Sequence, residues 1–387
     1  MLKVEEITRS ADLEGYREEW RDLVARTEGA LFFQTYEWLT SWIDRFWKDR
    51  PLVFLFVRDG DRLIGLAPLI EDQEGRFSFP GSLVLASNEY ALRAEFLCGE
   101  GADILDSVVR YLRETRGRVR LTLMNVQTGS PLLDQLPAVA KRHRLSSFSL
   151  AGWSSPVVRF PDGWQAYLRS RSSHLRSELR RKQRRIEGSG TVTCAAAVTP
   201  EESERAIEDV ISIERKSWKR GIGRSLDLEP DNERFYRCLA RRTAANGWLR
   251  LYVLYLNSRP AAFVYGFAFR DEYYAFHTSF DDAYRSLSPG AILFTNLLRD
   301  ACGRGLQVFL GAMPASVCDL DRLREEARWK SELATGLCFR ANVHVFSGGQ
   351  IRCHASKAYQ TRLKPFLKTR MPFVIEAGRR LRRLASH

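Results

Sequence analysis

The sequence has no segment that could cross a membrane as a helix. Its 387 residues contain no apolar run approaching the roughly 20 residues that a bilayer-spanning helix needs. At the beginning of the chain, Lys3, Glu5 and Glu6 stand where a secretory signal would be apolar. We therefore expect a cytoplasmic protein.

Cysteine spacing of the kind that binds metals is also missing. The seven cysteines are odd in number, scattered along the chain and never spaced as C-x-x-C. We expect reduced thiols and no metal site.

Positive charge, in contrast, is abundant and unevenly placed. Sixty Lys and Arg against 47 Asp and Glu give a net charge of +13, which favours an anionic partner. Residues 346–387 alone hold ten Lys and Arg against one acid, Glu376. Hydrophobic residues are interspersed among these cations, so residues 347–387 are predicted to form a basic amphipathic tail that binds the anionic inner face of a membrane peripherally. A solvated tail is the alternative.

The second half of the chain predicts a definite order of strands and helices. The order is β-α-α-β-β-β-α-β-α-β, over residues 191–197, 200–218, 232–245, 248–256, 261–270, 272–280, 291–302, 306–310, 319–333 and 336–346. The three central strands are rich in Val, Tyr and Phe and are joined by tight turns, which predicts an antiparallel meander.

The first half repeats this outline more faintly. Its strands are predicted over 2–7, 52–58, 62–70, 119–124 and 145–150, and its helices over 13–26, 36–46, 102–115 and 131–143. We therefore predict an α/β (α+β) protein with domains at 1–160 and 191–346, each a mixed, mostly antiparallel sheet flanked by helices. Two α/β domains without any internal relationship are the alternative.

A basic segment, residues 161–190, links the two halves. A single helix is predicted over Trp164–Glu187, with Leu168, Leu175, Leu179 and Ile186 on one face. The remaining face is basic, and Arg180 and Arg181 are its candidate substrate-binding residues. The helix is either a solvated linker or an anion-binding wall along a substrate groove.

The segment Arg285-Ser-Leu-Ser-Pro-Gly290 lies between a predicted strand and a predicted helix. A helix N-terminus binds phosphate because its first amides are unpaired and carry partial positive charge. Pro289 cannot donate a hydrogen bond, so the predicted donors are the amides of Gly290, Ala291 and Ile292. Ser288 and Arg285 add side-chain donors. Taken alone, the string is equally a good helix cap.

In this context, the chain resembles a known family. Arg285-x-x-Ser288-x-Gly290 fits the cofactor loop R/Q-x-x-G-x-G/A of GNAT acyltransferases, with Ser288 in place of the first glycine, and the predicted element order is that of the GNAT fold. The stretches 273–290, 172–188 and 32–38 resemble the double-GNAT acyltransferases of bacterial cellulose and exopolysaccharide biosynthesis, relatives of the FemABX aminoacyltransferases. The resemblance covers about residues 20–345.

The resemblance implies tandem GNAT-like domains and an N-acyltransferase activity. The donor would be an acyl-CoA or acyl carrier protein thioester. The acceptor would be a small-molecule amine of a cell-envelope precursor, such as an amino sugar; if residues 347–387 bind a membrane, a lipid amine such as a sphingoid base becomes a candidate. The first half has no counterpart of the loop at 285–290, so one active site per chain is expected.

One departure from the family concerns its usual D-F-G strand end followed by Y-K-x-x-W. Here the corresponding stretch is Val308-Phe-Leu-Gly311, without the aspartate, and Lys330 follows Trp329 in a shifted pattern. Lys330 is the candidate for the family lysine, and the missing aspartate puts the usual acceptor chemistry in doubt.

The candidate catalytic residues include a general base for the attacking amine. His277 is the first choice because an imidazole titrates near neutral pH. Strand alternation predicts His277 beside Ala275 and Ser279 on one face, with Phe276 on the other. A structural histidine is the alternative. Further candidates are Glu214 as a second base, Tyr284 as proton donor to the leaving thiolate, and Trp218 as a substrate contact.

Two other functions stay open. A FemABX-like enzyme would use aminoacyl-tRNA, for which the basic segment at 169–185 could serve; otherwise no nucleic acid partner is expected. A non-catalytic GNAT-like binding protein is the other alternative.

Overall fold

The computed structural model describes residues 2–73, 79, 81–99, 103–348, 357, 358 and 361. They form two compact units that are not two contiguous halves of the chain. The first unit contains residues up to 36, 49–152 and those from 340 onward, and the second contains 37–48 and 153–339. Most of the predicted basic tail, 347–387, lies outside the described residues.

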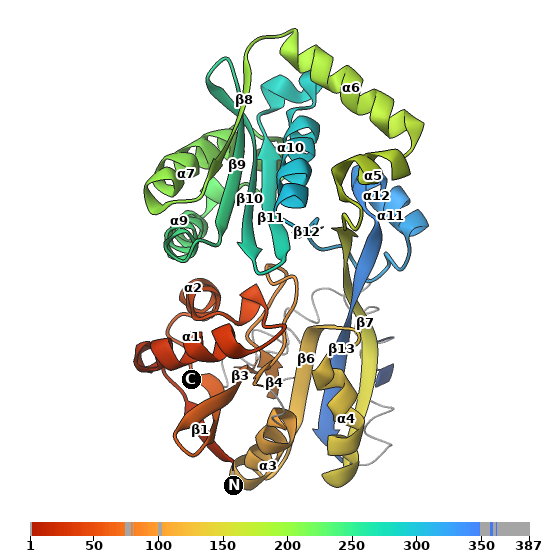
Figure 1. Ribbon diagram of the computed structural model, residues 1–387. Helices are drawn as coiled ribbons and strands as arrows, with labels where there is room; N and C mark the ends of the chain where they lie inside the picture. Colours follow the sequence, from red (N-terminus) through yellow and green to blue (C-terminus); the bar gives the residue numbers. More distant parts are fainter. Residues whose placement is uncertain are drawn as a thin grey trace. The chain divides into compact units, whose positions relative to one another are not determined.

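The first unit is a mostly antiparallel sheet with helices on both faces (Figure 1). Its strand order is β1-β2-β3-β4-β6-β13-β7, with β5 paired to β3. The strands are β1 (Lys3–Ile7), β2 (Leu52–Asp59), β3 (Arg62–Asp72), β4 (Ser82–Leu85), β5 (Leu97–Cys98), β6 (Arg120–Gln127), the start of β7 (Leu145–Val158) and the end of β13 (Gly336–Ser347). Its helical elements are η1 (Ser10–Tyr16), α1 (Arg17–Arg26), η2 (Phe32–Gln34), α3 (Ile104–Arg116) and α4 (Pro131–Arg142).

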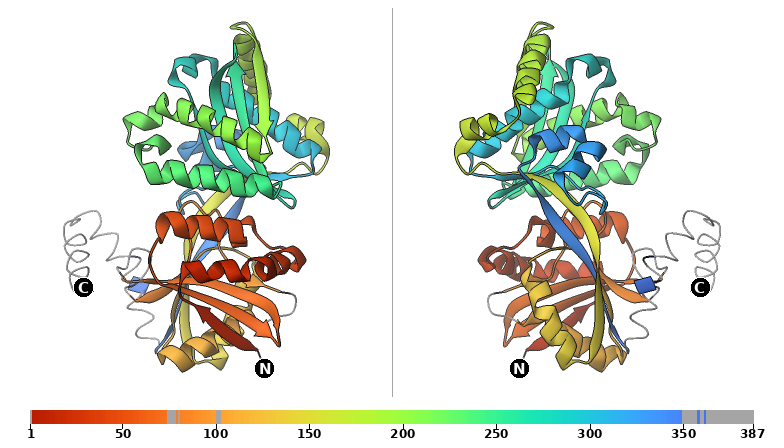
Figure 2. Two further views of the ribbon diagram at one scale, coloured as in Figure 1. Left: turned by 90° about the vertical axis from the view of Figure 1, so that its left-hand side faces the viewer. Right: turned by 90° about the vertical axis from the view of Figure 1, so that its right-hand side faces the viewer.

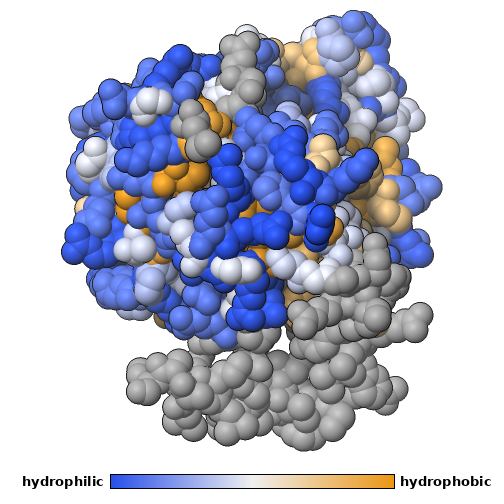
Figure 3. All heavy atoms as spheres, turned by 90° about the horizontal axis from the view of Figure 1, so that it is seen from below, coloured by the Kyte–Doolittle hydropathy of each residue, from blue (hydrophilic) through white to orange (hydrophobic). Residues whose placement is uncertain are grey.

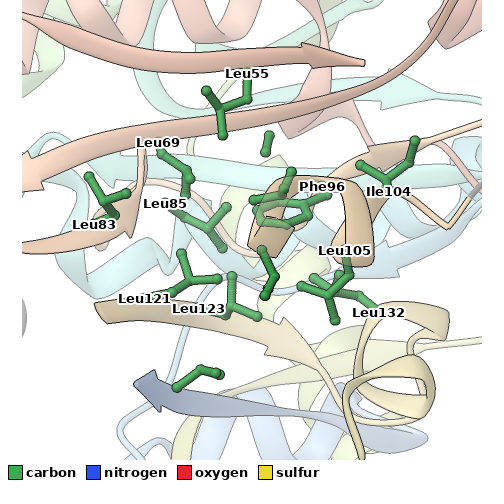
Figure 4. Packing of buried hydrophobic residues seen from close by; sticks show 14 of the residues in the cluster. Leu55, Leu69, Leu83, Leu85, Phe96, Ile104, Leu105, Leu121, Leu123 and Leu132 are labelled. Atoms are coloured by element: carbon green, nitrogen blue, oxygen red, sulfur yellow. The ribbon is translucent and has the colours of Figure 1, made fainter. Parts of the chain in front are cut away.

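The alternating side chains of β2 explain why both faces of this sheet are covered. Phe54 and Phe56 meet Trp20 of α1 edge-on, at centroid distances of 6.2 and 5.8 Å. The opposite face joins an aliphatic cluster with α3 and α4, in which Leu55 and Ile104 are fully buried (Figure 4). Every second residue of the strand thus enters a separate core.

The second unit has the strand order β7-β12-β11-β10-β9-β8, in which only β11 and β12 pair in parallel. Its strands are β8 (Val192–Ala197), β9 (Leu249–Leu256), β10 (Arg259–Phe269), β11 (Glu272–Phe280), β12 (Gln307–Phe309), the end of β7 and the start of β13. Its helical elements are α2 (Tyr36–Phe46), α5 (Gly163–Ser170), α6 (Ser173–Glu187), α7 (Pro200–Arg215), α8 (Trp218–Gly221), η3 (Leu226–Leu228), α9 (Pro230–Ala245), η4 (Asp282–Leu287), α10 (Pro289–Gly303), α11 (Leu320–Glu326) and α12 (Arg328–Leu333).

Helices cover both faces of this second sheet as well (Figure 2). Helices α7 and α9 lie on one face, and α10 packs on the other through Ile292, Leu293 and Leu297. Helix α7 begins at a capping box: Thr199 Oγ1 accepts from the Glu202 amide at 3.2 Å, and Glu202 Oε2 accepts from the Thr199 amide at 3.0 Å. The predicted fold class, a mixed and mostly antiparallel sheet flanked by helices, is confirmed.

A β-bulge interrupts the pairing of β10 with β11. Tyr265 opposes His277 while Gly266 opposes Ala275, so Phe276 is the extra residue. A side chain at Gly266 would overlap the Tyr273 hydroxyl and the Tyr274 carbonyl, which explains the glycine. The bulge changes the face on which the rest of β11 places its side chains.

Several predicted elements differ from the structure. The single helix predicted over 164–187 is two helices, α5 and α6, because Arg171 is extended and Ser172 caps α6 by accepting from the Leu175 amide at 3.1 Å. The helix predicted over 319–333 likewise breaks at Ala327. Strands β4 and β5 were not predicted, because they are only four and two residues long.

The surface seen in Figure 3 is mostly hydrophilic, with hydrophobic residues in separate small patches. None of the helices in the described part of the chain combines the length and the apolar composition that a membrane span requires.

Candidate active site

Three ionisable side chains meet between α7 and β11 in the second unit. Nε2 of His277 lies 3.2 Å from Oε1 of Glu214 and 3.2 Å from Nζ of Lys219. Lys219 Nζ is also 3.5 Å from Glu214 Oε1 and donates to the Thr278 carbonyl at 2.6 Å. The Glu214 side chain is fully buried, and those of Lys219 and His277 are 16% and 18% exposed. Lys219 and His277 are thus the two members of the group that retain some contact with solvent.

The chemistry of these groups allows two hydrogen-bonding arrangements. An ammonium only donates and a carboxylate only accepts, so Nε2 of His277 either accepts from Lys219 or donates to Glu214. When Nε2 carries the proton and donates to Glu214, Nδ1 is left as a basic nitrogen. This is the arrangement of a general base that is oriented by a carboxylate.

The surroundings of His277 and Glu214 shift the pKa values of both groups downward. Burial lowers the pKa of His277, and the positive charge of Lys219 lowers it further, although the hydrogen bond to Glu214 opposes both. Burial alone would raise the pKa of Glu214, but the hydrogen bond from His277 and the charges of His277 and Lys219 lower it to about 2. The lowered pKa of Glu214 favours an ionised carboxylate paired with Lys219, and the lowered pKa of His277 favours a neutral imidazole beside them.

The segment that follows α7 fixes Glu214 in place. The Leu226 amide donates to Glu214 Oε2 at 3.1 Å. The hydroxyls of Ser217 and Ser225 both donate to the Glu214 carbonyl, at 2.9 and 3.0 Å. Each of these bonds satisfies a polar group that burial would otherwise leave unpaired.

The bulge in β11 places His277 on the face opposite to the predicted one. Ala275 packs in the cluster under α10, whereas Phe276 and His277 both contact Tyr236 of α9, at centroid distances of 5.8 and 5.3 Å. His277 also stacks on Phe263 at 5.7 Å. Simple alternation fails because Phe276 is inserted at the bulge, so two consecutive side chains point to one face.

Lys219 is the member of this group that the sequence analysis missed. It follows Trp218 directly, in a stretch with four other cations among residues 215–224, and this charge density hides the single buried amine. Burial lowers the pKa of Lys219, opposed by Glu214. Trp218 itself is 44% exposed, next to this group along the chain.

Lys330 is a second, separate candidate. Its Nζ lies 3.4 Å from Met313 Sδ, and it adjoins Gly311 just beyond the end of β12. Pairing between β11 and β12 stops at Tyr274 and Phe309, so Lys330 lies where these strands separate. Burial lowers its pKa to about 8, and no ion pair among the described residues includes it.

The predicted donor turn stands at the beginning of α10. Ser288 is left-handed, with φ 55° and ψ 49°, and Pro289 is the first residue of the helix. The space around a side chain at Gly290 is open, with no atom within 4 Å, so the turn is not sealed inside the core. The Ala291 amide donates to the Ser288 carbonyl at 3.1 Å. Of the three amides predicted to bind the donor, those of Gly290 and Ile292 are not involved in this bond.

The other predicted contacts are dispersed in the structure. Arg285 pairs with Asp282 at 2.8 Å and is largely exposed. Tyr284 packs against the core cluster under α10. Arg180 and Arg181 are exposed on α6, where Arg181 pairs with Glu178 at 2.8 Å. His277 and Glu214 are thus the predicted pair that direct contact brings together.

The stretch that contains these side chains matches a known family model. Residues 173–312, from α6 to just beyond β12, match the family model of the GNAT acetyltransferase domain. A search of curated proteins finds no match.

Solved structures share the fold at low sequence identity. FemX is 10% identical, with a TM-score of 0.56 over 88% of this chain and 96% of its own. A C-terminal domain named for a lysylphosphatidylglycerol synthetase of Agrobacterium fabrum is 15% identical, with a TM-score of 0.54 over 93% and 97%. L-PGS from Bacillus licheniformis is 12% identical, with a TM-score of 0.53 over 92% and 97%. At these identities the similarity shows the fold, and residues 173–312 are similar to the GNAT acetyltransferase domain.

Proposed function

We propose that the protein is an N-acyltransferase that moves an acyl group from acyl-CoA to an amine. The observation that carries the proposal is the buried Glu214–His277 pair at the bulge of β11, within the stretch that matches the GNAT domain. A carboxylate-oriented neutral imidazole is suited to taking a proton from an attacking ammonium or amine.

The two substrates approach from the two faces of β11 and meet where it diverges from β12. The donor's pyrophosphate is held at the amide end of α10, and its thioester reaches the point where β11 and β12 diverge. The acceptor amine approaches from the side of α7 and α9, past Trp218. The amine nitrogen meets the thioester carbon in the gap between β11 and β12, which supplies proximity without a covalent enzyme intermediate.

The bond changes follow from these positions. The amine nitrogen attacks the thioester carbon, the new C–N bond forms, and the C–S bond breaks with release of the CoA thiolate. The amine proton passes to Nδ1 of His277 while Nε2 stays bonded to Glu214. The ammonium of Lys330 stabilises the negative charge that develops on the carbonyl oxygen and on the thiolate.

The acceptor class is proposed to be a cell-envelope amine, either a lipid amine such as a sphingoid base or an amino sugar. The charge of the chain supports an anionic surface or substrate nearby. Attachment to an anionic membrane through residues 347–387 is a proposal that rests on their sequence alone.

A panel of acyl-CoAs and amines tests the proposal. We expect release of free thiol that depends on the amine, with a matching amide product by mass spectrometry. Aminoacyl transfer from charged tRNA without turnover of any acyl-CoA would replace this function by the FemABX-like one. Tight CoA binding with no turnover for any amine would indicate a binding protein.

A further inference from the structure

Helix α6 carries two cations toward the turn that begins α10. Nη1 of Arg185 donates to the carbonyl of Ser286, within the turn, at 2.9 Å. Lys182 is three residues earlier on the helix and therefore lies on the same flank as Arg185. Helix α6 packs against both η4 and α10, as Figure 1 also shows for α10.

Neither cation is held by a close carboxylate among residues 103–348, although the charge of Lys182 acts on Glu178 one turn away. Glu178, the acid on the same flank, pairs with Arg181 at 2.8 Å. Within residues 103–348, no carboxylate lies at salt-bridge distance from Lys182 or Arg185. Lys182 is half-buried, although a long cationic side chain normally extends into water when nothing opposes it.

We infer that Lys182 and Arg185 bind the ribose 3′-phosphate of CoA, so that α6 selects the donor by its charge. The inference rests on the proposed function, because it takes the pyrophosphate to lie at the α10 turn. The 3′-phosphate is one ribose away from the pyrophosphate, and Arg185 stands directly beside the turn. Cations paired with phosphate oxygens form charge-assisted hydrogen bonds, which are stronger than neutral ones.

Two other polyanions fit the helix less well. The phosphopantetheine arm of an acyl carrier protein has no 3′-phosphate, so it would leave these two cations without a ligand in the site. Single-stranded RNA is usually held by aromatic stacking together with cations, and α6 contains no Phe, Tyr or Trp.

The test compares CoA with dephospho-CoA, which differ only in the 3′-phosphate, by calorimetric titration. For the unchanged protein we expect CoA to bind about 10- to 100-fold more tightly. In the double variant Lys182→Gln/Arg185→Gln this preference should fall to about threefold or less, with the affinity for dephospho-CoA unchanged. Arg184→Gln is the matched control, because it removes one charge from the same helix at a position about 100° away from Arg185, and it should keep the preference.

The possible results of these titrations distinguish failure of the inference about α6 from failure of the proposed function. An unchanged preference in the double variant overturns the inference while the proposed function stands. If neither nucleotide binds the unchanged protein, the proposed function fails instead. Loss of dephospho-CoA binding in the double variant would show that Arg185 merely supports the turn. Salt-sensitive retention of carrier protein or tRNA that the double variant loses, with the CoA preference intact, would assign α6 to that partner and also overturn the inference.

Discussion

Glu214 and His277 are 63 residues apart in the chain, and their side chains meet at 3.2 Å in the second unit. Glu214 is the penultimate residue of α7, and His277 follows the bulge of β11. The contact gives a buried carboxylate an ordered partner and gives an imidazole a fixed orientation. The same pair therefore bears on the stability of the fold and on the proposed chemistry.

Replacing Glu214 by Gln is expected to destabilise the protein by about 3 kcal/mol at neutral pH, because it leaves Lys219 buried without its counter-charge. The folded-state pKa of Glu214 is lowered from 4.5 to about 2, so its contribution is complete above pH 4.5 and is lost as the pH falls toward 2. Thermal melts of both proteins from pH 7 to pH 3 check this. The difference in melting temperature should shrink below pH 4.5, and a difference that stays constant would contradict the lowered pKa.

The activity of His277→Gln is expected to fall about 100-fold or more, the usual loss for a general base. Because burial and Lys219 lower the pKa of His277 below 6.5, the acid limb of the wild-type rate should lie below pH 6.5. Rates measured from pH 5 to pH 9 check both points. Near-normal turnover of the variant across that range would make His277 a structural residue.

Much of the second unit could be predicted from the sequence, because its strands and helices alternate with clear turn residues. The helix of α10 and the three strands of the meander lie within about two residues of their predicted bounds. The face of His277 could not be predicted, since the bulge depends on the close approach of Gly266 to Tyr273 and Tyr274 across the sheet. Lys219 was missed for a similar reason: only the fold shows which of several neighbouring cations is buried.

The bulge itself can be tested through Gly266. Gly266→Ala is expected to cost about 1–3 kcal/mol, because its methyl group would overlap the Tyr273 hydroxyl and the Tyr274 carbonyl. Gly303→Ala is the control, since no atom lies within 4 Å of a side chain there. Thermal denaturation should show a loss for the first variant and little change for the second. Equal effects would mean that β11 can relax around the added methyl group.

Lys330→Met is expected to change stability and activity in opposite directions. Burial lowers the pKa of Lys330 to about 8, so at pH 7 the side chain is charged and burying this charge destabilises the folded state. Removing it should raise stability by about 1–3 kcal/mol at pH 7 while turnover falls. Melting temperature and steady-state rate, measured on the same preparation, check the prediction. A variant that is less stable and fully active would exclude the proposed role of Lys330.

Binding of the acyl donor at the turn around Gly290 is the central claim, and a substitution at Gly290 tests it directly. Gly290 stands in open space, so Gly290→Glu should leave the fold intact while its carboxylate repels the donor's pyrophosphate from the amides of α10. The control is Gly303→Glu, which adds the same charge at the far end of the same helix. Calorimetric titration of acetyl-CoA should show binding to the unchanged protein and to the control, and a loss of at least about 100-fold for Gly290→Glu. Equal affinity of all three proteins for acetyl-CoA would contradict a donor site at this turn.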